Sequence, residues 1–292
     1  MRVAITGAAG LFGRGLVQVF SGRHEVYPLT RADADITVAE QVQAAFKKIR
    51  PDVVIHPAGI PDLDVCEAEP AKAYLVNVHG TRHVVEAARG VGAGVAYIST
   101  DAVFDGEKTS PYLETDPTNP PTVYGRTKVR AEKLVQGLPR HWIFRVSVLF
   151  GPGKTNIIER ALRNIMTGRE FDVASDQLGL ATYTLDAGLK IKEIIEKVWC
   201  GVYHLGNQGQ CTRLELVKQA AKLSGLDSKG IMGKSADQMG RRAVRLKYSV
   251  MELGALKSAG IPLPRPWQEA LAEYIPTLLA LLRPKGHEVA RS

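Results

Sequence analysis

The sequence has few cysteines and no long apolar segment. Its 292 residues contain three cysteines, Cys66, Cys200 and Cys211, none of them in CxxC spacing. This pattern argues against a disulfide framework or a structural zinc site, and it suits a reducing compartment. No apolar run approaches the roughly 20 residues that a membrane-spanning helix needs, and no secretory leader precedes the first strand-like segment. We therefore expect a cytoplasmic protein without a membrane partner, and we assign no metal ligands.

A dense block of lysine and arginine interleaved with aromatic residues is also missing, although the formal net charge is +8. Nucleic acid is therefore not an expected partner. The most basic stretch, residues 229–247, holds six Lys or Arg against one acid, Asp237. It suits either the phosphates of a nucleotide-linked ligand or simple exposure to solvent. The hydrophobic fraction of 45% is ordinary for a globular protein and allows a sizeable core.

Strand-like and helix-like segments alternate through the first half of the chain. We predict strands over residues 2–6, 25–29, 53–56, 95–99 and 142–146, helices over 11–20, 37–50, 70–89 and 123–136, and a Pro-rich loop over 109–121. Such alternation is typical of a parallel sheet with helices on both faces. The second half has a looser rhythm, with helices predicted over 156–167, 186–198, 214–223 and 267–282. Two of the helix starts, at Thr37 with Glu40 and at Thr212 with Glu215, have the spacing of capping boxes.

The predicted fold class is α/β, a Rossmann-type doubly wound parallel sheet with a smaller C-terminal α/β substrate-binding region. We expect an NAD(P)-binding domain over residues 1–150. The substrate-binding region should cover mainly 151–282, with the option that the chain crosses back into the first domain. The polar tail 283–292 is predicted to be disordered.

A glycine turn follows the first predicted strand. Gly7, Gly10 and Gly13 separate that strand from the first predicted helix, in GxxGxxG spacing. Glycines allow the backbone to approach a pyrophosphate closely, and the helix N-terminus offers free N–H groups to that anion. The placement between strand and helix, more than the glycines alone, indicates dinucleotide binding.

The end of the second predicted strand bears on the choice of cofactor. A carboxylate there would bind the ribose 2′-hydroxyl of NADH, whereas a basic residue would bind the 2′-phosphate of NADPH. The sequence has Thr30 and Arg31 at this point and no acid until Asp33. NADPH is therefore favoured, and NADH stays open.

Tyr124 and Lys128 are four residues apart on a predicted helix, so their side chains share one face. A nearby ammonium would lower the pKa of the phenol, and such a tyrosine can exchange a proton with a carbonyl or alcohol oxygen. Thr100 and Asp101 follow a predicted strand at the sheet edge where ligands bind in such folds. The Thr100 hydroxyl could join Tyr124 at the reacting oxygen, or both residues could only cap the loop.

With these motifs in this order, the chain resembles the extended short-chain dehydrogenase/reductase family, and within it the dTDP-4-dehydrorhamnose reductase-like branch. The resemblance covers nearly the whole chain. It is carried by Gly7–Gly13, Asp35–Ile36, Arg50–His56, Asn77–Gly80, Ser99–Gly106, Pro111–Glu114, Tyr124–Lys128, Phe144–Ser147 and Gly201–Leu205.

The resemblance implies hydride transfer from a nicotinamide to the C4 carbonyl of a nucleotide-linked 4-keto-6-deoxy sugar, with Tyr124 as proton donor. Thr100, Tyr124 and Lys128 would be catalytic, and Thr100, Asp101 and Val148 would meet the sugar. The implied cofactor contacts are Gly7, Gly10, Leu11, Phe12, Thr30, Arg31, Asp35, Ile36, Pro57, Ala58, Gly59, Ile98, Tyr124 and Lys128.

Four departures from the family pattern concern the substrate side. Ala102 stands where the reductases have Tyr, Val148 where they have Trp, and Leu180 where they have Arg, while their Arg-Pro segment is blurred into 241–245. The identity of the sugar therefore stays open.

Two other functions also stay open. One is a nucleotide-sugar epimerase or dehydratase of the same fold, although Ala102 removes the usual acidic residue of a dehydratase. The other is a non-catalytic NADP-binding subunit resembling the regulatory subunit of methionine adenosyltransferase. Both a monomer and a homodimer are compatible with the sequence.

Overall fold

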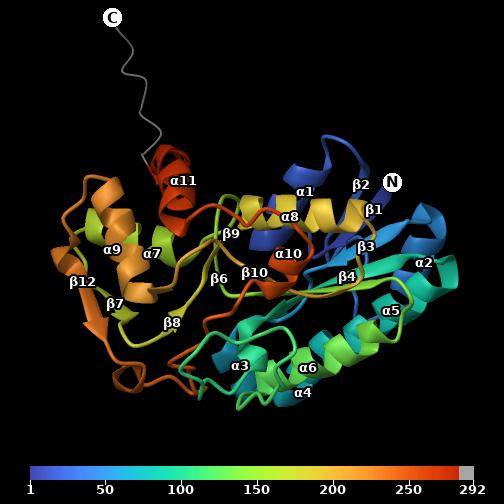
Figure 1. The fold of residues 1–292 in the computed structure, drawn as a ribbon, viewed down its shortest axis with the longest axis horizontal. Coiled ribbons are helices and arrows are strands. Elements are labelled where there is room, and N and C mark those ends of the chain that lie inside the picture. Colours follow the sequence, from blue (N-terminus) through green and yellow to red (C-terminus); the bar gives the residue numbers. More distant parts are fainter. Residues whose placement is uncertain (283–292) are drawn as a thin grey trace, which may run out of the picture.

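A parallel six-stranded sheet forms the centre of the molecule in the computed structural model, which describes residues 1–282. The predicted tail 283–292 lies outside the described residues. The strand order is β10-β5-β4-β3-β1-β2, and every neighbouring pair is parallel. The strands are β1 (Arg2–Thr6), β2 (Glu25–Leu29), β3 (Val53–His56), β4 (Gly94–Thr100), β5 (His141–Val146) and β10 (Gly201–Leu205). The predicted Rossmann-type fold class is confirmed (Figure 1).

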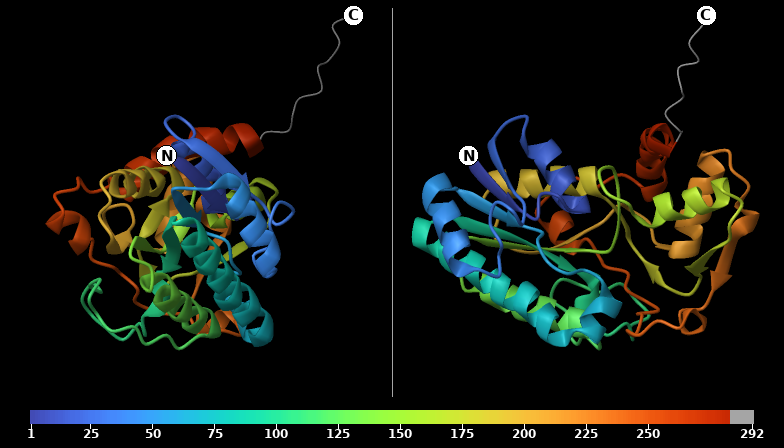
Figure 2. Two further views of the ribbon diagram at one scale, coloured as in Figure 1. Left: turned by 90° about the vertical axis from the view of Figure 1, so that its right-hand side faces the viewer. Right: turned by 180° about the vertical axis from the view of Figure 1, so that it is seen from behind.

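Helices cover both faces of this sheet (Figures 1 and 2). On one face α1 (Leu11–Phe20) packs against α8 (Thr184–Glu196). On the other lie α2 (Ala39–Ile49), α5 (Gly80–Val91) and α6 (Val123–Gln136). The strands β3 and β4 are buried along their whole length, as expected for strands covered on both faces.

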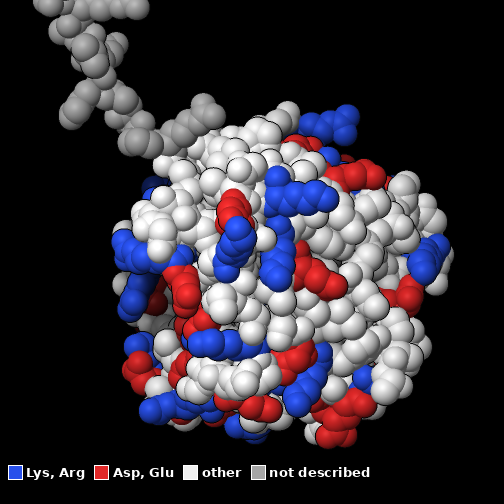
Figure 3. Space-filling view, turned by 90° about the vertical axis from the view of Figure 1, so that its left-hand side faces the viewer, with Lys and Arg blue, Asp and Glu red and all other residues white. Residues whose placement is uncertain are grey.

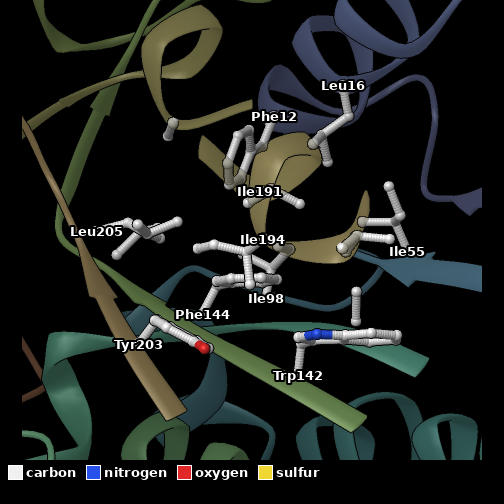
Figure 4. Close-up of a cluster of buried hydrophobic side chains, with 14 of the residues drawn as sticks. Phe12, Leu16, Ile55, Ile98, Trp142, Phe144, Ile191, Ile194, Tyr203 and Leu205 are labelled. Carbon is white, nitrogen blue, oxygen red and sulfur yellow. The ribbon is translucent and has the colours of Figure 1, made fainter. Parts of the chain in front are cut away.

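The core on the α1 and α8 side joins side chains from distant parts of the sequence (Figure 4). Phe12 and Leu16 of α1 meet Ile191 and Ile194 of α8 above the sheet residue Phe144. Since α8 belongs to the second half of the chain, the two halves of the sequence share this core.

The second region is built from short strand pairs. They join β6 (Val148–Phe150) to β9 (Ala181–Tyr183), β7 (Phe171–Ala174) to β12 (Ile231–Lys234), and β8 (Leu178–Gly179) to β11 (Cys211–Thr212). Its helices are α7 (Ile157–Met166), α9 (Arg213–Leu223) and α11 (Trp267–Leu282), and a separate apolar cluster holds them together. The chain returns to the central sheet with α8 and β10, and α10 (Gly254–Ser258) packs on β10. The predicted domain limits at 150 and 282 remain a prediction.

One predicted helix start is wrong and another is confirmed. The helix predicted from Thr37 begins at Ala39, and its N-cap Val38 makes no side-chain hydrogen bond. Thr37 instead donates its hydroxyl to Asp35 Oδ1 at 2.7 Å, because a nearer acceptor competes with the cap. The capping box of Thr212 and Glu215 is present.

The helix predicted over 70–89 is a composite. It consists of α4 (Pro70–Tyr74), a π-helical turn over Leu75–His79, and α5. A short helix that the sequence did not predict, α3 (Leu63–Ala68), precedes it and is capped by the Asp62 carboxylate. A 3-10 turn, η2 (Asp101–Val103), follows β4. Over residues 1–282, no helix is both long and apolar enough to cross a membrane.

Candidate active site

The predicted site residues come together where the strands β1, β3 and β4 end. The glycine turn follows β1, the segment 57–59 follows β3, and Thr100 closes β4. Because parallel strands point the same way, these segments share one edge of the sheet, the edge at which ligands bind in this class of fold.

The glycine turn needs its glycines. Gly7 has a positive φ of 57°, and a Cβ there would lie 2.8 Å from the Cα of Ala58. A Cβ on Gly13 would lie 2.2 Å from the carbonyl oxygen of Gly7. Gly10 is the N-cap of α1 and supplies no side-chain hydrogen bond, and the first turn holds no acid. The first N–H groups of α1 are thus available to an anion such as a pyrophosphate.

Four of the expected cofactor residues have buried side chains: Phe12, Ile36, Ile98 and Lys128. Phe12 is 4% exposed and lies in the core below α1, so any contact with a pyrophosphate must come from its backbone (Figure 4). Leu11, by contrast, is half-buried. Ile36 is 8% exposed and packs so closely on Gly80 that a Cβ at position 80 would lie 2.8 Å from Ile36 Cδ1.

The segment after β2 is tied down by two carboxylates. Asp33 accepts hydrogen bonds from the Thr30 hydroxyl at 2.6 Å and from the Thr30 N–H at 2.8 Å, and these bonds lower its pKa. Arg31 pairs with Asp35 at 2.8 Å while its side chain stays 86% exposed. Both acids therefore have partners, and the Arg31 guanidinium remains accessible to a phosphate.

Asn77 fixes the segment Pro57, Ala58 and Gly59. Its Oδ1 accepts from the Ile60 N–H at 2.7 Å, and its Nδ2 donates to Ile60 O and to Thr127 Oγ1, each at 3.1 Å. Asn77 lies in the π-helical turn, and Thr127 precedes Lys128. The sequence stretch 77–80 contributed to the family resemblance but gave no role for Asn77, because the contact depends on the π-helical register.

Lys128 is buried beside the end of β4. Its ammonium donates to the carbonyl oxygen of Ile98 at 2.5 Å and lies 4.0 Å from the ring centroid of Tyr97. Burial lowers the pKa of Lys128 to about 7, against the opposing effect of the Glu132 carboxylate. Near neutral pH this lysine can therefore exist in both protonation states.

Tyr124 is partly buried and close to Thr100. Burial raises the pKa of Tyr124 above its ordinary value, the Thr100 hydroxyl lowers it in part, and the Asp101 carboxylate raises it. The predicted lowering of this pKa by Lys128 is wrong in this structure, because the ammonium is turned toward the carbonyl oxygen of Ile98. The phenol is therefore protonated in this structure and has a proton that it can donate.

A buried ion pair lies one helical turn beyond Lys128. The Glu132 carboxylate accepts from Arg145 Nη2 at 2.8 Å, from Arg145 Nε at 3.1 Å and from the Ser99 hydroxyl at 2.5 Å. Both partners are about 5% exposed or less. No sequence motif indicated this pair, although the spacing of 124, 128 and 132 places all three side chains on one helix face.

Asp101 links the two regions. Its Oδ1 accepts from the Thr100 hydroxyl at 3.0 Å, and its Oδ2 accepts from Ser147 at 2.6 Å and Ser249 at 2.7 Å. Thr100 also caps the turn η2, because its Oγ1 accepts from the Ala102 N–H. The loop-capping role considered for Thr100 is thus present, and Asp101 holds hydroxyls from three segments.

The departures from the family pattern have different surroundings. Ala102 is buried, as is Leu180 in the main core, whereas Val148 is half-buried at the start of β6. Arg245, in the blurred segment, pairs with Asp64 at 2.8 Å. Leu180 is therefore an apolar core residue rather than a substitute for a ligand-binding arginine.

The basic stretch 229–247 is not a surface of one sign. Most of its cations have an acid within 4.0 Å. Lys229 pairs with Asp227, Lys234 with Asp172, and Lys247 with Asp237. Asp64 lies near both Arg241 and Arg245. Figure 3 shows positive and negative side chains interspersed on this end of the molecule. Over residues 1–282, no three His, Cys, Asp or Glu residues gather as a metal site would require.

The fold and the site together define an oxidoreductase built on a dinucleotide-binding sheet. The family model described as RmlD substrate binding domain matches residues 1–280, so the chain belongs to this dTDP-4-dehydrorhamnose reductase-like family, as the sequence motifs predicted.

Individual relatives agree over almost the full length. The spore coat polysaccharide biosynthesis protein SpsK of Bacillus subtilis is 36% identical over 94% of this chain and 96% of its own. A dTDP-4-dehydrorhamnose reductase of Streptomyces griseus is 36% identical over 95% of this chain and 94% of its own. The crystal structure of dTDP-4-dehydrorhamnose reductase from Bacillus anthracis in complex with NADP superimposes with a TM-score of 0.91 at 32% identity, covering 94% of this chain and 99% of that one.

Proposed function

We propose that this protein reduces the C4 carbonyl of a nucleotide-linked 4-keto-6-deoxy sugar, with NADPH as the reductant. The observation that carries the proposal is the convergence of Tyr124, Thr100 and Lys128 at the sheet edge beyond an open helix N-terminus. The NADP bound to the Bacillus anthracis relative and the reductase activity in the names of relatives support it.

The chain offers suitable groups for each part of NADPH. The N–H groups of Leu11 and Phe12, in the first turn of α1, suit the pyrophosphate, and the exposed Arg31 suits the 2′-phosphate. The segment 57–59, fixed by Asn77, and the carboxyl end of β4 would line the nicotinamide side. When bound, NADPH supplies the hydride.

The side chains of this protein supply the proton and the positioning. Tyr124 Oη would donate its proton to the C4 oxygen as that oxygen gains charge. The Thr100 hydroxyl donates its one proton to Asp101 Oδ1 at 3.0 Å in this structure, and it would turn from Asp101 to donate that proton to the same C4 oxygen. A protonated Lys128 would stabilise the phenolate left on Tyr124 once its ammonium turns from Ile98 O.

The test is to follow reduced-nicotinamide absorbance with a panel of dTDP-linked 4-keto-6-deoxy sugars and both cofactors. We expect one NADPH to be consumed for each 4-hydroxy sugar formed, and slower turnover with NADH. Product formed without net consumption of cofactor would instead identify an epimerase or dehydratase. Tight NADP binding without turnover of any sugar would identify a non-catalytic subunit.

A further inference from the structure

Arg213 is a cation beside the substrate end of the site that the family motifs do not include. It is the first residue of α9 and follows β11, in which Cys211 pairs with Gly179 of β8. A Cβ on Gly179 would lie 3.0 Å from the Ser249 hydroxyl and 4.0 Å from Asp101 Oδ2. The strand pair that leads into Arg213 therefore borders the hydroxyl cluster around Asp101.

The Arg213 guanidinium has no partner in the described part of the chain. Among residues 1–282 it makes no hydrogen bond and no ion pair, although it is partly buried and burial lowers its pKa. The Asp101 carboxylate attracts it and the Arg245 guanidinium repels it. Asp101 accepts three hydroxyl hydrogen bonds and makes none with Arg213, so its attraction acts without direct contact.

The other charges nearby do not compensate Arg213 either. Arg245 is paired with Asp64 and also donates to the carbonyl oxygen of Ala243. A cation in the first turn of a helix is also disfavoured by the helix dipole. The capping box of Thr212 and Glu215 satisfies the helix start without any contribution from Arg213. What this arrangement lacks is an anion in direct contact with the Arg213 guanidinium.

We propose that Arg213 binds the diphosphate of the nucleotide-linked substrate, so that it selects nucleotide sugars over free sugars. The inference rests on the proposed function and adds a residue to it. A guanidinium binds phosphate oxygens through paired, charge-assisted hydrogen bonds, and desolvation strengthens such bonds. The diphosphate would then lie between Arg213 and the sugar-binding hydroxyls around Asp101.

The direct test is calorimetric titration of the full chain, saturated with NADP, with dTDP. We expect Arg213→Gln to weaken dTDP binding by about tenfold to a hundredfold, the range for losing a charged hydrogen-bond partner. Arg213→Lys should fall between that variant and the wild type. Lys218→Gln, on an exposed position of the same helix, should bind dTDP as the wild type does.

A purely structural role for Arg213 gives a different result. In that case Arg213→Gln would lower the melting temperature through lost attraction to Asp101, while dTDP affinity stayed unchanged, and the inference would be overturned. In steady-state assays the inference requires KM for the dTDP-linked sugar to rise by about tenfold or more with little change in kcat. The dTDP titration needs no turnover, so failure of the proposed reaction and failure of this assignment are distinguishable.

Discussion

The region around the central sheet and the region built from short strand pairs treat their polar groups differently. Beside the sheet, Lys128, Glu132 and Arg145 are buried, and each has a partner within its own region. The short-strand region meets the sheet through polar links such as Ser249 to Asp101 and Arg245 to Asp64. Of the departures from the family pattern, Val148 and Leu180 lie in or next to the short strands, and Ala102 lies in the turn η2 at the end of β4.

This difference indicates that the region around the sheet holds the proton-transfer groups and that the short-strand region contributes to the substrate side. The proton-transfer groups are held by buried bonds that tolerate little change, whereas Val148, on the substrate side, is half-buried and can vary without disturbing them. The two regions share the core cluster that contains Leu180, and the second region also has an apolar cluster of its own around α7, α9 and α11.

The largest effect is expected at the proton donor. Tyr124→Phe should lower kcat by about a hundredfold to ten-thousandfold, because it removes the only proton that the side chain can donate. NADPH affinity, measured by fluorescence titration, should stay nearly unchanged. Tyr27→Phe, on the edge strand β2, is the matched control and should behave as the wild type. Full activity in Tyr124→Phe would mean that Tyr124 is not the proton donor and that the proton-transfer step does not lie in the sheet region.

Glu132→Gln should affect both stability and pH dependence. Loss of the carboxylate leaves Arg145 buried without its counter-charge, which costs about 3–5 kcal/mol in chemical denaturation. Because Glu132 raises the pKa of Lys128, the variant should also shift the corresponding limb of the kcat profile from about 7 to lower pH. Glu193→Gln, which breaks exposed ion pairs, should cost less than about 1 kcal/mol. Equal costs for the two variants would contradict the contrast between buried and exposed pairs.

Gly13→Ala probes the glycine turn. Its Cβ would lie 2.2 Å from Gly7 O, so the turn must shift, at a cost of about 1–3 kcal/mol and with weaker NADPH binding. Gly22→Ala serves as the control, because a Cβ at Gly22 has no neighbour within 4 Å. If both variants bind NADPH like the wild type, the turn is not the pyrophosphate site.

The smallest expected change is in the free energy of unfolding per pH unit, and two buried histidines cause it. Burial lowers the pKa of His56 and of His204 to about 3, well below the ordinary value of 6.5. Between pH 3 and pH 6.5 the folded state therefore binds fewer protons than the unfolded state. The contribution of these histidines to the free energy of unfolding is complete above pH 6.5 and falls as the pH drops toward 3. The loss should be about 1.4 kcal/mol per pH unit for each histidine.

Denaturation midpoints from pH 7 to 5 would measure this slope. His56→Gln should reduce it by about half, since one of the two buried histidines is gone. His79→Gln, at an exposed position, should leave it unchanged. If His56→Gln leaves the slope unchanged, the buried hydrogen bonds around β3 open before His56 takes up a proton.

Periodicity and motif order predicted much of the sheet region. The alternation of strands and helices and the glycine turn depend on local sequence, so the predicted fold class was correct. The pairing of Glu132 with Arg145, and of Arg245 with Asp64, joins residues far apart in the sequence, and no local pattern reports it. The same holds for the basic stretch 229–247, whose neutralising Asp64 and Asp172 come from other elements.

Isotope transfer directly follows the hydride that we propose moves from NADPH to C4 of the sugar. The protein would be incubated with NADPH carrying deuterium at the transferable C4 position of the nicotinamide, together with a dTDP-linked 4-keto-6-deoxy sugar, and the product would be examined by NMR. We expect deuterium at C4 of the sugar in one-to-one ratio with the NADPH consumed. A product without deuterium at that carbon, or no product with any 4-keto sugar while the NADPH stays intact, would contradict it.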